Sequence, residues 1–122
     1  MQSKIRFDFS AQVWISPGMG GWVFVSLPKE LAQEIRQHLG SLEEGWGRMK
    51  ATAQIGELSW DTAIWFDKKQ NTYLLPLKAE IRKKAQVNLR DTISLSILIW
   101  ERKEFTRYEL RYFDKLSIGL RH

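Results

Sequence analysis

An alternation of apolar and polar residues near the start of the chain is the feature that most constrains its fold. From Lys4 to Ile15 every odd position is apolar, and the even positions up to Gln12 are polar or charged. This period of two predicts a β-strand with one buried face. We therefore expect a mainly β protein in which other strands cover that face.

The rest of the chain predicts further strands and two helices. The predicted strands cover Trp22–Leu27, Met49–Ile55, Leu58–Phe66, Thr72–Leu75 and Thr92–Trp100. Because proline suits the first turn of a helix and glycine suits its end, one helix of about three turns is predicted between Pro28 and Gly40. A second, short helix is predicted from Ala79 to Lys84, and the Gly56-Glu57 pair predicts a tight hairpin turn.

The two halves of the chain share an order of elements. Leu27-Pro28 and Leu75-Pro76 each follow a strand and precede a helix, a loop and another strand. Two such units cannot each bury a core, so we expect them to interlock around a pseudo-two-fold axis. The predicted fold is one small closed β-barrel of about six or seven strands, since closure removes exposed strand edges. A chance repeat of a common junction, or a parallel α/β sheet with longer helices, is the alternative.

The sequence divides into a barrel domain over residues 1–100 and a C-terminal extension over residues 101–122. The extension alternates as a strand does at Thr106, Tyr108, Leu110 and Tyr112, yet Phe105, Tyr108, Tyr112 and Leu116 also fit a helical stripe. A strand that pairs with the preceding one is the favoured interpretation. The extension is expected to pack on the barrel or on a partner.

Several classes of chemistry are excluded or disfavoured by composition. The chain has no cysteine, so disulfides, thiolate nucleophiles and cysteine-bound metals are excluded. Its two histidines lack ligand spacing and its carboxylates form no catalytic pair, so we expect no metal, no cofactor, no catalytic residue and no enzyme activity. No signal peptide or apolar run of about 20 residues is found, which predicts a cytoplasmic protein without a membrane contact.

Six tryptophans in 122 residues are the unusual feature, together with a formal charge of +5. Trp60 and Trp65 have opposite parity in one predicted strand and are expected on opposite faces. Trp46 lies between two glycines and precedes Arg48 and Lys50. It either plugs one end of the barrel or forms an exposed stacking platform. Aromatic faces beside cations suit a nucleotide or single-stranded nucleic acid, so we predict a binding site formed by Trp46, Arg48, Lys50, Lys68 and Lys69.

An alternative function is a protein-interaction or assembly domain. The extension is more aromatic than a free tail needs to be, and a homodimer could form through it. The candidate interaction residues are Phe105, Tyr108, Tyr112 and Phe113.

The sequence resembles a bacterial domain-of-unknown-function family, the one numbered nineteen hundred and five, over residues 5 to 100. Members are sometimes fused to bacteriocin-protection (OmpD-associated) domains. The motifs that carry the resemblance are Phe9-Ser10-Ala11, Val13-Trp14, Gly20-Gly21-Trp22, Phe24-Val25, Leu27-Pro28, Gly45-Trp46-Gly47, Ala51-Thr52-Ala53-Gln54-Ile55-Gly56, Trp60 and Tyr73-Leu74-Leu75-Pro76. The resemblance implies a small β-barrel and leaves the activity open.

The second half also looks like the swapped-hairpin element of AbrB-like transcription factors. The similarity covers Leu75 to Arg82, Val87 and Arg90 to Leu95. Arg90 stands where that pattern usually has glycine. The DNA-binding activity of those dimers is not carried over from half a motif.

Overall fold

The structure is a computed structural model, and it describes residues 2–18 and 20–102. The four candidate interaction residues of the C-terminal extension, Phe105, Tyr108, Tyr112 and Phe113, lie outside the described residues. The same holds for the choice between strand and helix in that segment.

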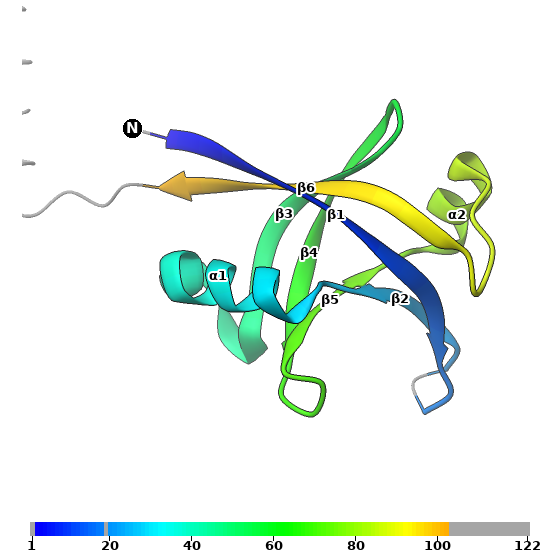
Figure 1. The fold of residues 1–122 in the computed structure, drawn as a ribbon, viewed down its shortest axis with the longest axis horizontal. Helices are drawn as coiled ribbons and strands as arrows, with labels where there is room; N and C mark the ends of the chain where they lie inside the picture. Colours follow the sequence, from blue (N-terminus) through cyan, green and yellow to red (C-terminus); the bar gives the residue numbers. More distant parts are fainter. Residues whose placement is uncertain (1, 19, 103–122) are drawn as a thin grey trace, which may run out of the picture.

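Six strands form a closed antiparallel barrel in the order β1-β2-β5-β4-β3-β6 (Figure 1). This confirms the predicted mainly β fold and the closed barrel, with six strands in the part of the chain that the structure describes. The strands are β1 (Gln2–Ser16), β2 (Trp22–Ser26), β3 (Arg48–Ile55), β4 (Leu58–Asp67), β5 (Thr72–Pro76) and β6 (Thr92–Arg102). The strands β1 and β6 extend beyond the predicted bounds because Gln2 pairs with Arg102.

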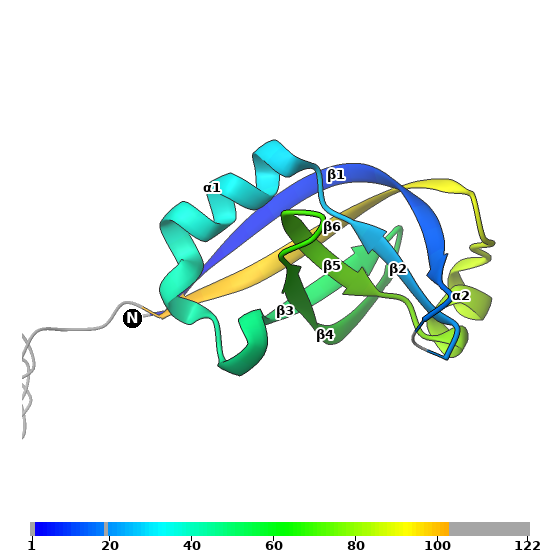
Figure 2. The same cartoon turned by 90° about the horizontal axis from the view of Figure 1, so that it is seen from below.

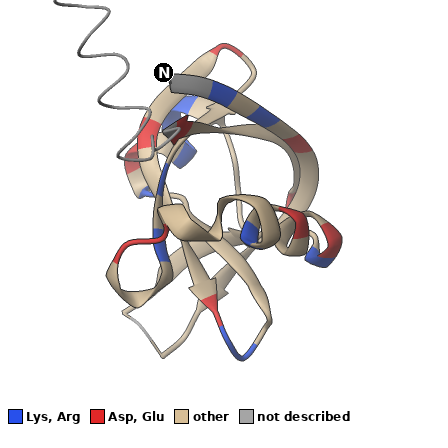
Figure 3. Ribbon diagram, turned by 90° about the vertical axis from the view of Figure 1, so that its left-hand side faces the viewer, with Lys and Arg blue, Asp and Glu red and all other residues tan. Residues whose placement is uncertain are grey.

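Two helices accompany the barrel, as the sequence predicts. The helices are α1 (Lys29–Leu39) and α2 (Ala79–Ala85). Two short 3-10 turns, Gly40–Leu42 and Gly45–Gly47, follow α1 and lead into β3. Figure 3 shows α1 lying across one opening of the barrel, which the buried side chains of Ala32, Ile35 and Leu39 close.

Two long strands, β1 and β4, interlock the two halves of the chain. β1 pairs first with β6 and then, from Val13 onward, with β2. β4 pairs first with β3 and then, from Trp65 onward, with β5. Figure 2 shows the short strands β2 and β5 side by side, where the halves meet. The strand order stays the same when each strand is replaced by its counterpart in the other half, that is, β1 by β4, β2 by β5 and β3 by β6. This symmetry is compatible with the predicted two-fold arrangement. The sequence repeat itself stays a prediction.

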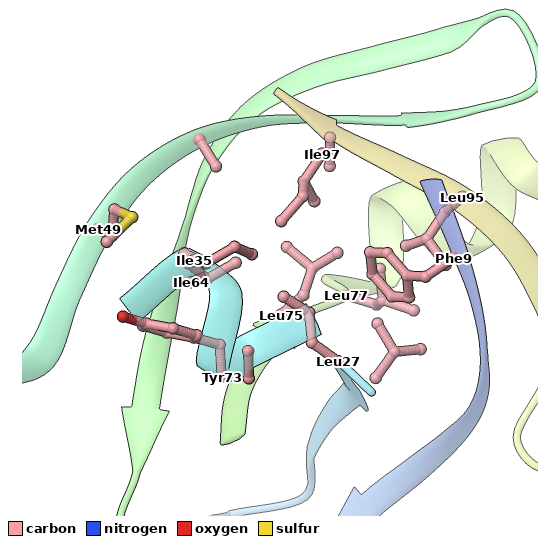
Figure 4. Close-up of a cluster of buried hydrophobic side chains, with 14 of the residues drawn as sticks. Phe9, Leu27, Ile35, Met49, Ile64, Tyr73, Leu75, Leu77, Leu95 and Ile97 are labelled. Atoms are coloured by element: carbon pink, nitrogen blue, oxygen red, sulfur yellow. The ribbon is translucent and has the colours of Figure 1, made fainter. Parts of the chain in front are cut away.

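The core fills the barrel with side chains from alternate strand positions. Val25, Ala53, Tyr73, Leu75 and Ile97 are fully buried. Figure 4 shows Ile35 of α1 reaching toward Ile64 and Tyr73. The alternation therefore predicted the buried faces of the strands correctly, because strand geometry sends successive side chains to opposite faces. Ile15 at the end of β1 is the exception, since it is exposed.

The loop between α2 and β6 contains the departure from the swapped-hairpin pattern. Arg90 adopts a φ of +72°. This region favours glycine, because a side chain at positive φ meets the backbone. The main-chain nitrogen of Arg90 donates a 2.9 Å hydrogen bond to the carbonyl oxygen of Val13. The turn thus retains the backbone shape that glycine would adopt, and it is tied to β1.

Truncation of a core side chain tests this packing. We expect Ile97→Ala to lower the free energy of unfolding by about 2 to 5 kcal/mol, because the substitution leaves a cavity at a fully buried site. Ser59→Ala, at an exposed position of β4, should change it by less than about 0.5 kcal/mol. Urea denaturation of both variants is the measurement, and equal stabilities would contradict the assigned faces.

Candidate functional site

The largest hollow described is a groove of about 1110 Å³ on the outside of the barrel. It crosses β3 and β4, from the end of β6 to the start of α2. The residues that line it include the exposed indoles of Trp22, Trp65 and Trp100, the partly buried Trp60, and the basic side chains of Arg48, Lys50 and Lys78. Arg48 and Lys50 are two of the five residues predicted from the sequence.

Strand parity places the three exposed indoles, Trp22, Trp65 and Trp100, on the outer face of the barrel. In β4, Trp60 packs against the core while Trp65 is exposed, which confirms their predicted opposite faces. Trp100 follows the inward Ile97 and Ile99 of β6 and is half-exposed on the outer face. Trp22 begins β2 and is also half-exposed. Sequence reasoning missed all three as site residues, although the parity of Trp65 was the signal that could have found it.

Trp46 stands on the loop beside the groove and is 93% exposed. It therefore does not plug the barrel, and its role as a stacking platform stays a prediction. Its φ of +66° lies in the left-handed region, which is uncommon for a residue with a side chain. The fold thus holds a large apolar side chain in water and in a backbone conformation that costs free energy.

A partly buried hydrogen bond anchors the loop that carries Trp46. The Tyr73 hydroxyl donates to Glu43 Oε1 at 2.6 Å. Arg36 Nε lies 3.8 Å from the same oxygen, and the Arg36 guanidinium lies 3.7 Å from the centre of the Phe66 ring. Burial, and then the hydrogen bond to Glu43, raises the pKa of the Tyr73 phenol well above its usual range. Tyr73 therefore remains a neutral donor over the whole physiological range of pH.

A close approach of the backbone fixes the other side of the loop. A Cβ atom at Gly47 would lie 3.1 Å from the Phe66 Cβ, and the φ of Gly47 is +71°. Both observations require glycine at this position. The sequence predicted a loop here, whereas the contact with Phe66 arises from the register of β3 and β4.

Salt bridges compensate part of the positive charge near Trp46. Glu44 pairs with both Arg48, at 2.5 Å, and Lys50, at 3.7 Å. The Arg48 guanidinium also lies 5.6 Å from the centre of the Trp65 ring, within the range of a cation–π contact. Arg48 is therefore held between a carboxylate and an indole.

Lys68 and Lys69 lie in the turn between β4 and β5 and are exposed. Because Phe66 touches Gly47, this turn leaves the barrel at the same end as the Trp46 loop. Neither lysine takes part in a salt bridge with any residue that the structure describes. Of the five predicted residues, Arg48 and Lys50 thus line the groove, Trp46 stands on the loop that leads into Arg48, and Lys68 and Lys69 lie in a separate turn that is not part of the groove lining.

Two further properties concern the described part of the chain, residues 2–18 and 20–102. Within it, no group of three or more histidine, aspartate or glutamate residues is placed to hold a metal ion. No helix there has the length and apolar character needed to cross a membrane.

Comparison with known protein families identifies the family of this chain. The model of the family described as "Domain of unknown function (DUF1905)" matches residues 9–97, which is most of the chain. The chain therefore belongs to this family. No curated protein matches the sequence.

The contact of Gly47 with Phe66 can be tested by adding a methyl group. We expect Gly47→Ala to lower the free energy of unfolding by about 1 to 3 kcal/mol, since it adds backbone strain and a steric contact. Gly45→Ala is the matched control, because a Cβ at Gly45 meets no atom within 4 Å. Thermal unfolding of both variants is the measurement. Equal destabilisation would contradict the described loop.

The raised pKa of Tyr73 predicts a dependence of stability on alkaline pH. The unfolded phenol ionises near pH 10, whereas burial and the hydrogen bond to Glu43 hold the pKa of the folded one well above that. The stabilisation is therefore complete below pH about 10 and is lost as the pH rises further, by up to about 1.4 kcal/mol per pH unit. Urea denaturation between pH about 9 and 11 is the measurement. Tyr73→Phe should show a shallower decline, and an identical slope would contradict the assignment.

Proposed function

We propose that this member of the DUF1905 family is a non-enzymatic binding module for unpaired nucleic-acid bases. The observation that carries the proposal is four exposed indoles on one groove and its adjoining loop, beside lysines without carboxylate partners in the described part of the chain. The indoles are those of Trp22, Trp46, Trp65 and Trp100. Single-stranded nucleic acid is the expected ligand, and a nucleotide is its smallest unit. The proposal assumes the cytoplasmic location predicted from the sequence.

Stacking supplies the binding energy in this proposal. A base stacked on an aromatic side chain contributes about 1 to 3 kcal/mol, and any base can stack because each has a π face. An indole without packing neighbours contributes little packing free energy in the free protein, and a stacked base supplies that free energy in a complex. Trp46 fits this role best, because it is the most exposed large apolar residue described. Its loop is fixed by Glu43 and Gly47, so little entropy is lost when a base binds.

The cations divide into two groups according to their partners. Arg48 and Lys50 share the single carboxylate of Glu44, so part of their positive charge is already compensated. Lys68, Lys69 and Lys78 have no salt bridge with a described residue and remain for phosphate contacts. About three phosphate contacts imply a moderate dependence on salt, with a slope of log K against log salt of about −2 for a single strand.

The predicted alternative, assembly through the C-terminal extension, stays a prediction. Its four aromatic residues lie outside the described part of the chain. The described groove favours a ligand with flat apolar faces, which supports the first proposal.

Trp46→Ala tests the stacking contact. We expect it to weaken binding of a short fluorescent oligothymidylate by about 5- to 100-fold, which corresponds to the loss of about 1 to 3 kcal/mol of stacking. Lys68→Ala should instead weaken binding modestly and reduce the salt slope by about 0.7. Fluorescence anisotropy at several salt concentrations is the measurement. A parallel titration with a mononucleotide distinguishes a strand-binding site from a nucleotide pocket.

The control for these variants is Lys29→Ala, which removes an exposed lysine at the start of α1. It should leave affinity and salt slope close to those of the unmodified protein. Flat titrations at low salt, or equal effects of Trp46→Ala and Lys29→Ala, would overturn the proposal.

A further inference from the structure

A carboxylate of the protein itself lies between two cations of the groove. Arg48 and Lys50 project from the outer face of β3, because they are two residues apart and the intervening Met49 is buried. Glu44 comes from the segment between the two 3-10 turns and reaches both of them. Its Oε1 atom lies 2.5 Å from Arg48 Nη1, and its Oε2 atom lies 3.7 Å from Lys50 Nζ. The two oxygens of one anion therefore bridge the pair of cations.

The same arrangement of cations suits the phosphate group of a ligand. A guanidinium donates several N–H groups in a fixed fork, which fits the oxygens of a phosphate as well as those of a carboxylate. A lysine beside it adds a second positive charge that adapts to either anion. Glu44 therefore occupies the position in which Arg48 and Lys50 would hold a phosphate.

This position adjoins a surface on which a base can stack. Arg48 pairs with Trp65 across β3 and β4, and its guanidinium lies 5.6 Å from the centre of the Trp65 ring. The Trp65 indole is partly exposed and lines the same groove as Glu44. A phosphate bound by Arg48 would thus lie beside an indole that accepts the neighbouring base of the same strand.

The Glu44 side chain can leave the cations without releasing its loop. It is 45% exposed, the Lys50 side chain is 77% exposed, and ion pairs this accessible to water contribute little to stability. The backbone of Glu44 is held separately, because its main-chain nitrogen donates a 2.6 Å hydrogen bond to the carbonyl oxygen of Arg48. The loop therefore keeps its attachment to β3 when the carboxylate moves away.

We propose that Arg48 and Lys50 form a phosphate subsite that the carboxylate of Glu44 occupies in the free protein. Glu44 is then an internal competitor, which a ligand phosphate replaces. An isolated anion gains little from this exchange, whereas a phosphate next to a base also gains the stacking contact. The competitor therefore favours nucleic acid over simple anions. The inference rests on the proposed function for the identity of the ligand, while the subsite itself is testable with an inorganic anion.

Glu44→Gln tests the subsite, because it removes the charge and keeps the size of the side chain. We expect inorganic triphosphate, at fixed ionic strength, to bind this variant about 3- to 10-fold more tightly than it binds the unmodified protein, since two ion pairs no longer compete. An NMR titration that follows the backbone amides of Arg48 and Lys50 and the indole N–H of Trp65 is the measurement. Urea denaturation shows that the variant is folded.

Glu80→Gln is the matched control. Glu80 lines the same groove but pairs with Lys84, which does not line it. This variant removes the same charge without freeing Arg48 or Lys50, so its affinity for triphosphate should rise by less than about twofold. Adding Arg48→Ala to Glu44→Gln should abolish most of the gain. Equal gains from the two glutamate variants, or a full gain without Arg48, would overturn the proposal.

A parallel titration with oligothymidylate separates this inference from the proposed function. Glu44→Gln should bind the strand more tightly and steepen the salt slope by up to about 1.4, because two more cations meet phosphates. Tighter triphosphate binding with no strand binding by either protein would support the subsite and overturn the proposed function. Unchanged triphosphate binding by Glu44→Gln would overturn the subsite, and strand binding by the unmodified protein would then still support the proposed function.

Discussion

The pairing of β1 with β6 is the constraint on which the rest of the structure depends. It joins residues 2–12 to residues 92–102 in one continuous antiparallel ladder. Without it, the six strands would form an open sheet whose two exposed edges are β1 and β6. With it, the sheet closes, and the apolar positions of all six strands meet in one interior. The position of every outward side chain then follows from strand parity.

The candidate site forms where the pairing between β3 and β6 stops. Six strands of unequal length cannot pair along their full extent, so β3 and β6 separate and the outer face becomes hollow. The same parity that fills the core sends Trp65 and Trp100 to this hollow. The 3-10 turn at Gly45–Gly47 adds Trp46 at its margin. The site therefore needs no insertion or separate domain, because it is formed by the ends of regular strands.

Much of this architecture could be predicted from the sequence, because alternation is a local property. The strands, their buried faces, the Gly56-Glu57 hairpin and both helices were predicted correctly. The groove could not be predicted from the sequence, because it depends on the order of the strands and on where their pairing stops. The hydrogen bond from Tyr73 to Glu43 joins residues that are distant in sequence, and no pattern marks them as partners. Trp46 was singled out correctly as unusual, but only coordinates decide whether it points inward or outward.

The ladder between the first and last strands also dictates when this protein can fold during synthesis. β1 leaves the ribosome before β2 to β5, whereas its partner β6 follows all of them. Until β6 emerges, the apolar face of β1 and the side chains that later surround Phe9 have no complete cover. The nascent chain therefore remains incompletely folded, with unpaired strand edges, until β6 is made. Strand-rich proteins are prone to aggregate at this stage. Charged residues on the outer face of β1, such as Arg6 and Asp8, keep that waiting strand hydrated.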